Sequence, residues 1–224
     1  MDAFTTIALI QNDFTEKFGV PFQSNVVKNE SLIIFEPAFR NPDALRGLAA
    51  FSHIWLIWGF SENRRTQWSP TVRPPRLGGN IRMGVFATRS PFRPNPIGLS
   101  SVELLRIEQH PTFGPLIHVL GADLMNGTPI YDIKPYIPAD CHPDAVGGFA
   151  ADPWPRRLHV DIDPGLCPAL PPKTLAVLRD ILACDPRPPY HHSPDRIYGM
   201  SYGEWEIKFR VTENLLTVTS IFKR

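Results

Sequence analysis

Prolines divide this chain into short segments, and no other feature of the sequence restricts its fold as strongly. The 224 residues include 25 prolines, about twice the usual share. Proline is excluded from helix interiors and from central strands, so each proline marks a loop or the end of an element. The elements between the prolines must therefore be short.

The segments between the prolines are rich in β-branched and aromatic residues, which is typical of strands. Six segments are predicted as strands: 4–10, 31–35, 53–60, 83–88, 99–108 and 115–123. HIWLIWGF (53–60) is apolar at almost every position, which predicts a central strand buried on both faces. LSSVELLRIE (99–108) mixes Ser, Glu and Arg with apolar residues, as a strand with one face in water requires.

Helix signals are scarce before residue 140. One short helix is predicted at 42–50, where Asn41 can cap it and Pro42 suits its first position. Because no run of helices alternates with the strands, the sequence favours an antiparallel sheet closed into a barrel over a doubly wound α/β domain. We therefore predict a mainly β protein with a non-Rossmann β-barrel domain at residues 1–140.

The remaining residues, 141–224, predict a linker and a small α+β C-terminal domain. The segment 138–172 is rich in Pro, Gly and Asp and is interpreted as a long connection. WEIKFRVTENLLTVTSIF alternates on either side of a Thr-Glu-Asn turn, which predicts a hairpin. PPKTLAVLRDILACDPRP predicts a helix whose apolar face is formed by Leu175, Leu178, Ile181 and Leu182.

Composition excludes several classes of protein. The chain is 43% apolar and 20% charged, which argues for an ordinary core and against disorder. Three dispersed cysteines show no metal or disulfide spacing, so we expect a reducing cytoplasm and no metal. The N-terminus lacks a basic signal-peptide region, and no stretch approaches the ~20 apolar residues of a membrane helix. We expect no membrane association.

Residues 63–102 contain seven arginines and no aspartate, glutamate or lysine, although the net charge of the chain is only +1. Arginine binds phosphate or carboxylate through two parallel hydrogen bonds. If these residues served only to keep the protein soluble, lysine would do equally well. The prolines among these arginines stiffen the loops, which lowers the entropy lost on ligand binding. The pattern predicts an anion-binding surface; the alternative for any single arginine is a bond to a backbone carbonyl that holds a loop.

A second candidate segment is DLMNGTPIYDIKPYIP, residues 123–138. Asn126-Gly127-Thr128 predicts a turn with exposed backbone amides. Such amides can hydrogen-bond to the edge of an adenine base, because glycine lets a ligand approach the backbone closely. Asp132 and Tyr136 offer a base and a hydrogen-bonding ring. The alternative is a β-hairpin with a polar tip.

The sequence lacks the motifs of the common nucleotide and nucleophile sites. It has no Gly-x-Ser-x-Gly. RLGGNIRMG lacks the spacing of the P-loop and of the dinucleotide fingerprint, and it precedes a predicted strand instead of linking a strand to a helix. An adenosyl cofactor would therefore have to bind outside the usual mononucleotide fold.

Taken together, these segments resemble the TsaA-like family, also called the TrmO family, of S-adenosylmethionine-dependent tRNA methyltransferases. The resemblance implies a homodimeric β-barrel enzyme that methylates N6 of N6-threonylcarbamoyladenosine at position 37, beside the anticodon of threonine-decoding tRNA. The matching segments are VPFQ (20–23), LRGLAAFSHIWLIWGF (45–60), TVRPPRLGG (71–79), MGVFATRSPFRPNPIG (83–98), NGTPIYDIKPYIP (126–138) and DPRPPY (185–190).

The resemblance also implies site residues by matching position. Asp132 and Tyr136 would stand near the methyl-transfer site. The chain departs from common family residues at four positions. It has Phe22 where the family often has a basic residue, Ser61-Glu62 in place of His-Gln, and Asn126 in place of Asp. S-adenosylmethionine would contact Pro21, Phe22, Gln23, Ser61, Glu62, Arg89, Leu99, Met125, Asn126, Gly127 and Thr128.

For the reaction, we expect Asp132 to accept the proton of the acceptor nitrogen and Tyr136 to orient the base. Two other functions stay open: a non-catalytic RNA-binding β module, and a methyltransferase of the same fold with another substrate. Contacts to tRNA phosphates or to the threonyl carboxylate are assigned to Arg73, Arg76 and Arg93, and Lys134 is also assigned to the substrate or RNA. Arg187 and Tyr190 could hold the anticodon arm, by charge and by stacking. The alternative for that segment is a proline turn that ends the helix.

Overall fold

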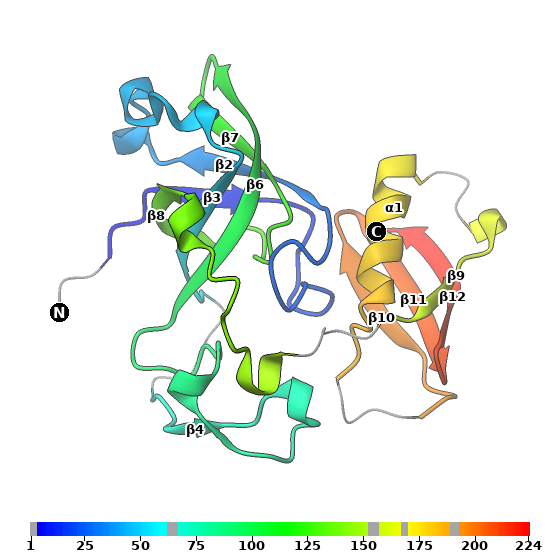
Figure 1. Cartoon of the computed structure of the whole chain (residues 1–224). Helices are drawn as coiled ribbons and strands as arrows, with labels where there is room; N and C mark the ends of the chain where they lie inside the picture. Colours follow the sequence, from blue (N-terminus) through cyan, green and yellow to red (C-terminus); the bar gives the residue numbers. More distant parts are fainter. Residues whose placement is uncertain (1–3, 62–66, 152–156, 167–169, 189–192) are drawn as a thin grey trace.

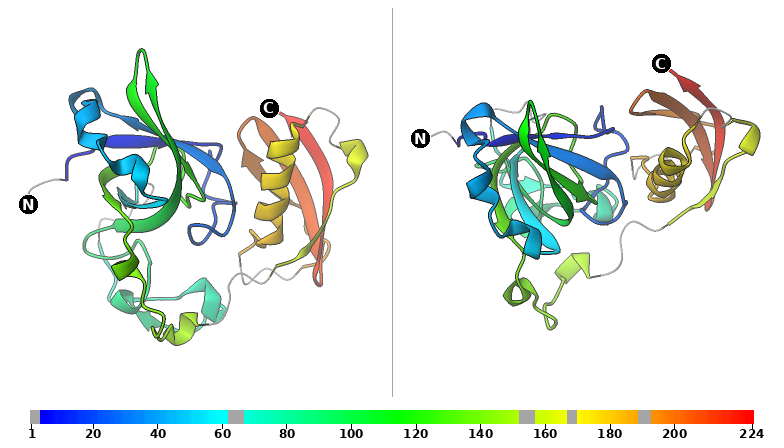
Figure 2. Two further views of the ribbon diagram at one scale, coloured as in Figure 1. Left: turned by 45° about the horizontal axis from the view of Figure 1, so that its top comes forward. Right: turned by 90° about the horizontal axis from the view of Figure 1, so that it is seen from above.

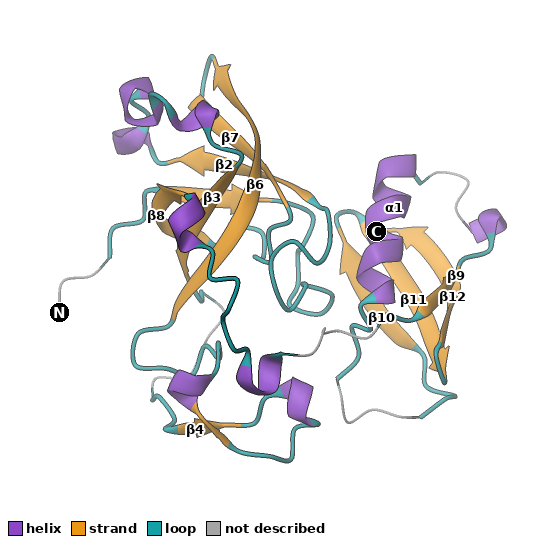
Figure 3. Ribbon diagram, viewed as in Figure 1, coloured by secondary structure: helices purple, strands orange, loops and turns teal. Residues whose placement is uncertain are grey.

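The computed structural model describes residues 4–61, 67–151, 157–166, 170–188 and 193–224. Two bodies built mainly of strands lie side by side, one from the first part of the chain and one from the last (Figure 1). Strand and loop dominate both bodies, and among the described residues α1 (Pro172–Ala183) is the only α-helix (Figure 3). That helix, the longest in the described part, is too short to cross a membrane.

The first body is a closed barrel of six strands, in the order β1-β2-β7-β6-β3-β8, with every neighbouring pair antiparallel. Alternate residues point inward, so Ile33, Leu56 and Ile117 form part of a buried core. The predicted mainly β, barrel-containing fold is confirmed. The strands are β1 Ala8–Gln11, β2 Glu30–Phe35, β3 His53–Gly59, β6 Ile97–His110, β7 Gly114–Leu120 and β8 Pro129–Pro135.

The prediction that residues 53–60 form a strand buried on both faces is wrong. Ile54, Leu56 and Trp58 are buried, whereas His53 and Trp55 are only partly buried. The strand is therefore buried on one face and not on both, because a closed barrel has a single interior. Its apolar outer face lies under later segments of the chain: the Trp55 indole donates to Asp140, at 2.8 Å.

Two short predicted elements were wrong. The segment 42–50 forms two 3-10 helices, η2 (Pro42–Leu45) and η3 (Leu48–Ala50), because Arg46 between them leaves the helical region at ψ 121°. Asn41 does cap the first turn. The segment 83–88 contributes only β5 (Met83–Gly84), whose partner β4 (Thr71–Val72) is equally short because prolines lie on either side of it.

The second body is a four-stranded sheet, in the order β10-β11-β12-β9, with α1 packed on it. The strands are β9 His159–Asp161, β10 Tyr198–Tyr202, β11 Trp205–Thr212 and β12 Leu215–Lys223. The predicted helix and C-terminal hairpin are confirmed. Strand β9 lies inside the predicted connection 138–172 and pairs in parallel with β12, so that segment is not loop throughout. The further 3-10 helices are η1 Pro37–Phe39, η4 Pro75–Leu77, η5 Val85–Ala87, η6 Pro138–Asp140, η7 Gly148–Ala150 and η8 Pro164–Leu166.

The loop between β1 and β2, residues 12–29, joins the two bodies; we call it the bridging loop. It reaches from the barrel to the C-terminal sheet in every view (Figure 2). Phe14 and Val27 are each 1% exposed and belong to the core of the second body. The Gly203 amide donates to the Asp13 carbonyl at 2.7 Å, and the Ser201 amide donates to Glu16 at 2.6 Å. The second core therefore includes residues from near the start of the chain.

Candidate functional site

A cavity of about 560 Å³ lies between one end of the barrel and the arginine-rich loops; we call it the central cavity. Its barrel side is formed by residues around Trp58–Ser61 and Asp123–Thr128. Segments 69–75 and 88–92 form the opposite side, and the bridging loop adds Lys17 and Val20. The volume falls in the range of pockets that hold small molecules.

The predicted turn at Asn126–Thr128 lies at this cavity, but its amides are already bonded. The Asn126 amide donates to the Phe14 carbonyl at 2.9 Å and the Gly127 amide to the Ile10 carbonyl at 2.8 Å. The Thr128 amide donates to Met125 within the turn. The prediction of exposed amides is therefore wrong: these bonds fix the turn against β1 and the bridging loop, and Met125 and Thr128 line the cavity.

An acidic side chain that the sequence analysis did not single out lies in the cavity wall. Ser100, which is 2% exposed, accepts a hydrogen bond from the Trp58 indole at 3.0 Å. Its hydroxyl donates to Oδ1 of Asp123 at 2.5 Å. Burial raises the pKa of the Asp123 carboxyl, and the Ser100 hydroxyl partly opposes that rise. The only sequence signal for Asp123 is its position between the end of β7 and the turn.

The arginines divide between the cavity and internal contacts. Arg73 and Arg82 line the central cavity, and Arg82 also donates to the Thr71 hydroxyl at 3.1 Å. Arg93 instead donates to the Thr88 carbonyl at 3.1 Å, which is the loop-holding alternative considered from the sequence. Arg82 was absent from the predicted site.

A second hollow, the side groove, brings together four predicted residues: Gln23, Arg89, Leu99 and Tyr136. The Arg89 guanidinium donates to the Gln23 side chain. The Tyr136 ring lies 5.5 Å from the indole of Trp55, centroid to centroid. The charge of Arg89 also acts on Asp123 and lowers its pKa. Asp123 therefore lies where the two hollows approach each other.

The remaining predicted residues lie elsewhere. Asp132 faces a hollow beside η2 and η3 and forms a 2.8 Å ion pair with Lys134; it does not line the central cavity. Pro21 and Phe22 line a small hollow against the end of α1. Arg187 forms a two-pronged pair with Asp185, with both distances 2.8 Å. Ser61 lines the central cavity, and Glu62 and Tyr190 lie outside the described residues.

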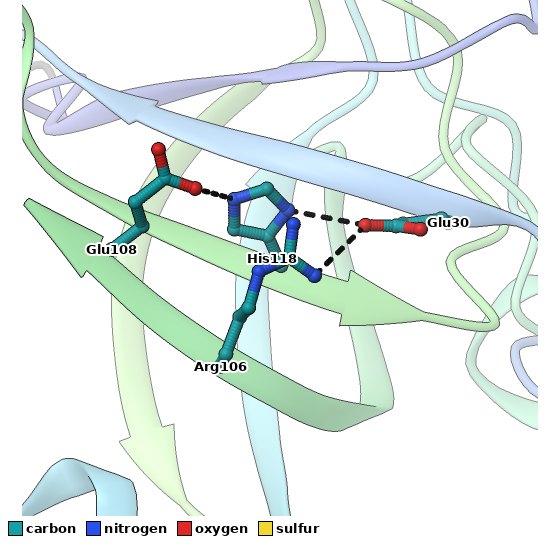
Figure 4. Close-up of polar contacts among 4 residues, drawn as sticks. All are labelled: Glu30, Arg106, Glu108 and His118. Carbon is teal, nitrogen blue, oxygen red and sulfur yellow. Dashed lines mark hydrogen bonds and ion pairs between the residues drawn. The ribbon is translucent and has the colours of Figure 1, made fainter. Parts of the chain in front are cut away.

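A cluster of charged residues lies on the outer wall of the barrel (Figure 4), and none of its members lines either hollow. His118 Nδ1 lies 3.1 Å from Glu30, and its Nε2 lies 3.0 Å from Glu108. Arg106 also donates to Glu30, at 3.3 Å. The cluster links β2, β6 and β7. In the described part of the chain, no group of three or more His, Cys, Asp or Glu side chains has the arrangement of a metal site.

Comparison with known proteins places this architecture among characterised families. The family model of the tRNA-methyltransferase O N-terminal domain matches residues 9–141, and the model of the TrmO C-terminal domain matches residues 166–224. A protein of Escherichia coli (strain K12) named tRNA (adenine(37)-N6)-methyltransferase is 42% identical, and the match covers 94% of this chain and 93% of that protein.

Two further relatives support the same placement. A protein of Eikenella corrodens with the same name is 47% identical over 77% of this chain and 97% of its own. A putative S-adenosylmethionine-dependent methyltransferase of Pseudomonas aeruginosa PAO1 is 36% identical over 90% of this chain and 89% of its own. A crystal structure of TrmO from Pseudomonas aeruginosa superposes with a TM-score of 0.80 at 29% identity, covering 99% of this chain and 98% of that one.

Proposed function

The chain belongs to the tRNA-methyltransferase O family of tRNA adenine-N6 methyltransferases, and from this we propose that it methylates N6 of the adenine at position 37 of tRNA. The observation that carries the proposal is the similarity to the Escherichia coli and Eikenella corrodens proteins over most of the chain. The central cavity, with its cationic side chains, is where we place the reaction.

We propose S-adenosylmethionine as the methyl donor, since several relatives are named for its use or binding. When bound, it supplies a methyl group activated by a sulfonium. The lining residues fit such a ligand: Arg89 can pair with its carboxylate, and the apolar wall around Trp58 suits its adenosine. The predicted contacts Gln23, Ser61, Arg89, Leu99 and Met125–Thr128 flank these two hollows and remain our assignment.

The finer substrate we propose is N6-threonylcarbamoyladenosine in threonine-decoding tRNA. Its threonyl group carries a carboxylate, so a suitable site needs a fixed cation beside the base. Lys17, Arg73 and Arg82 all line the central cavity. Guanidinium groups suit a carboxylate better than ammonium groups do, because they donate two parallel hydrogen bonds.

For tRNA contact we propose the arginine hairpin, residues 68–86, which includes β4, β5 and three arginines. The rings of Trp68 and Phe86 stack near its base with centroids 6.3 Å apart, and the two side chains are 50% and 72% exposed. Exposed aromatic rings beside arginines are the usual platform for unpaired RNA bases. Arg93, which is bonded to Thr88, then supports the loop.

We also propose a homodimer, as the resemblance implies, and a cytoplasmic location, as expected from the dispersed cysteines. The hollow beside η1–η3 is lined by apolar side chains that include Phe39 and Phe51, each 37% exposed. Light scattering on the purified protein measures the oligomeric state directly; a monomer at micromolar concentration would contradict this part.

The test of function is a comparison of two substrates. The protein is incubated with S-adenosylmethionine and either unmodified or threonylcarbamoylated tRNA, and the nucleosides are analysed by mass. We expect a gain of one methyl group on N6-threonylcarbamoyladenosine only. Methylation of unmodified adenine would retain the enzyme class and overturn the substrate, and no methylation of either would overturn the function.

A further inference from the structure

We propose that Asp123 is the proton acceptor for methyl transfer in the central cavity, in place of the sequence candidate Asp132. The inference rests on the proposed function, because it concerns the acceptor nitrogen of that reaction. The two aspartates lie in different hollows: Asp123 lines the central cavity, whereas Asp132 lines the hollow beside η2 and η3.

Asp123 is the one acidic side chain among the described residues that line the central cavity. The other charged side chains there, Lys17, Arg73 and Arg82, are cations with no free lone pair for a proton at neutral pH. Asp132, by contrast, is held by Lys134 at 2.8 Å on another part of the wall. A group that removes a proton inside the central cavity can therefore be Asp123 and not Asp132.

A chain of hydrogen bonds from the barrel interior orients the Asp123 carboxylate. The Trp58 indole donates to Ser100, whose single hydroxyl proton is thereby directed to Oδ1 of Asp123. The indole needs space beside β6, and Gly98 provides it: a Cβ there would lie 2.2 Å from the Trp58 ring. The backbone amides of Asp123 and Ser24 also hydrogen-bond to this carboxylate. We assign the proton to Oδ2, the oxygen that does not accept from Ser100.

The electrostatic surroundings make this carboxylate a stronger base than an exposed one. Burial has the largest effect and raises its pKa, while the Ser100 hydroxyl, the backbone amides of Asp123 and Ser24 and the charge of Arg89 lower it. A base works best when its pKa approaches the working pH. The other charged side chains that line the cavity are Lys17, Arg73 and Arg82.

In the proposed step, N6 of the nucleoside gives its proton to Oδ2 of Asp123. The electron pair left on N6 forms the new bond to the methyl carbon. The bond between that carbon and sulfur breaks, its electrons stay on sulfur, and the neutral thioether leaves. The carboxylic acid formed at Asp123 then loses its proton to solvent, so charge and atoms balance.

The main experiment uses Asp123→Asn in the full-length chain. The amide keeps an oxygen that can accept from Ser100 but cannot take the proton, so we expect the single-turnover methylation rate to fall at least ~100-fold. The dissociation constant for S-adenosylmethionine, measured by calorimetry, should stay within about threefold. Asp43→Asn, the same change in an exposed ion pair with Arg46, is the matched control and should leave both values unchanged.

A second variant, Ser100→Ala, tests whether Asp123 accepts a proton or has only a structural role. It removes a hydrogen bond that lowers the pKa of Asp123, so the acidic limb of the pH–rate profile should move to higher pH. Because Ser100 also orients the carboxylate, the plateau rate should fall as well, but less than in Asp123→Asn. Carbon-13 NMR of the carboxyl group in the free protein should show the same upward shift without any turnover.

The outcomes distinguish this inference from the proposed function. If the wild-type protein methylates tRNA and Asp123→Asn is equally active, only the inference is overturned. The same follows if the rate is lost in Asp132→Asn alone. It also follows if Asp123→Asn weakens cofactor binding with the rate at saturating cofactor unchanged, since Asp123 would then hold the cationic donor. If the wild-type protein neither binds S-adenosylmethionine nor methylates tRNA, the proposed function itself fails.

Discussion

At the scale of single residues, position in the fold decides chemistry that residue type leaves open. Asp123 and Asp132 lie within ten positions of each other in the sequence, yet one borders the central cavity and the other forms an ion pair with Lys134 on a different surface. The sequence analysis named Asp132 as the base and did not single out Asp123. The direction of each side chain depends on the register of β8 and on the end of β7, which the sequence does not show.

Gly127 gives a prediction at this scale. Its φ of 77° lies in the left-handed region, and a Cβ there would meet no atom within 4 Å. Gly127→Ala should therefore lower the free energy of unfolding by about 1–2 kcal/mol through backbone strain alone, as measured by urea denaturation.

Gly84→Ala is the matched control, since Gly84 also has open space around its Cβ but an ordinary φ of −56°. Its effect should stay within about 0.5 kcal/mol. Equal losses in the two variants would show that strain at the turn is not the cause.

At the scale of elements, long strands could be predicted from the sequence and short ones could not. The barrel strands β2, β6 and β7 followed from alternating or apolar runs of adequate length. Strand β9 has three residues and pairs with a strand far along the chain, so no local period reveals it. The segment 83–88 has strand-like composition, but its partner is too short to support a ladder. Composition alone cannot supply a pairing partner.

The charge cluster on the barrel wall gives a prediction for three elements together. The His118 hydrogen bond holds the pKa of Glu30 below its ordinary value of 4.5, with a further contribution from Arg106. A lowered folded-state pKa contributes stability that is present above the unfolded value and is lost as the pH falls through the folded value. Glu30→Gln should therefore destabilise the protein at pH 7, and the difference from wild type should shrink below pH 4.5.

The expected size is below about 1 kcal/mol, because Glu30 is about half exposed and solvent screens the pair. Urea denaturation at several pH values measures it. Glu103→Gln, which removes a single exposed ion pair with Lys28, is the comparison. A loss from Glu30→Gln that is independent of pH would contradict the ionic explanation.

The arginine hairpin gives the third prediction. Stacking of one base on an aromatic ring is worth about 1–3 kcal/mol, so Trp68→Ala should weaken tRNA affinity about tenfold or more while leaving binding of S-adenosylmethionine unchanged. Filter binding at fixed salt provides the measurement. Phe113→Ala removes another exposed aromatic ring, at the turn between β6 and β7, and should have no effect on tRNA affinity.

At the scale of the whole molecule, the bridging loop unites the two bodies. Phe18, Val20 and Val26 pack against the C-terminal core that encloses Phe14 and Val27. The same loop contains Gln23, which we assign to the cofactor, and supplies the carbonyl that accepts from Asn126. The mainly β fold class could be predicted from pattern. The location of this loop could not, because the C-terminal partners of its apolar residues lie more than 130 residues away in the chain.

Phe14→Ala tests this arrangement. The side chain is 1% exposed, and loss of a fully buried phenylalanine costs about 3–5 kcal/mol. We expect a loss of that size in the free energy of unfolding, together with faster hydrogen exchange of the Gly203 amide, which is bonded to the loop at Asp13. Phe86→Ala, at a 72% exposed position, should change stability by less than about 0.5 kcal/mol.

The bridging loop also sets a rule for building chimeras of this protein. Exchanging residues 166–224 for the corresponding part of a relative would pack a foreign helix and sheet against Phe14 and Val27, which the recipient chain would keep. A viable graft must carry residues 12–29 as well, so the transplantable module is discontinuous in the gene although it is continuous in space.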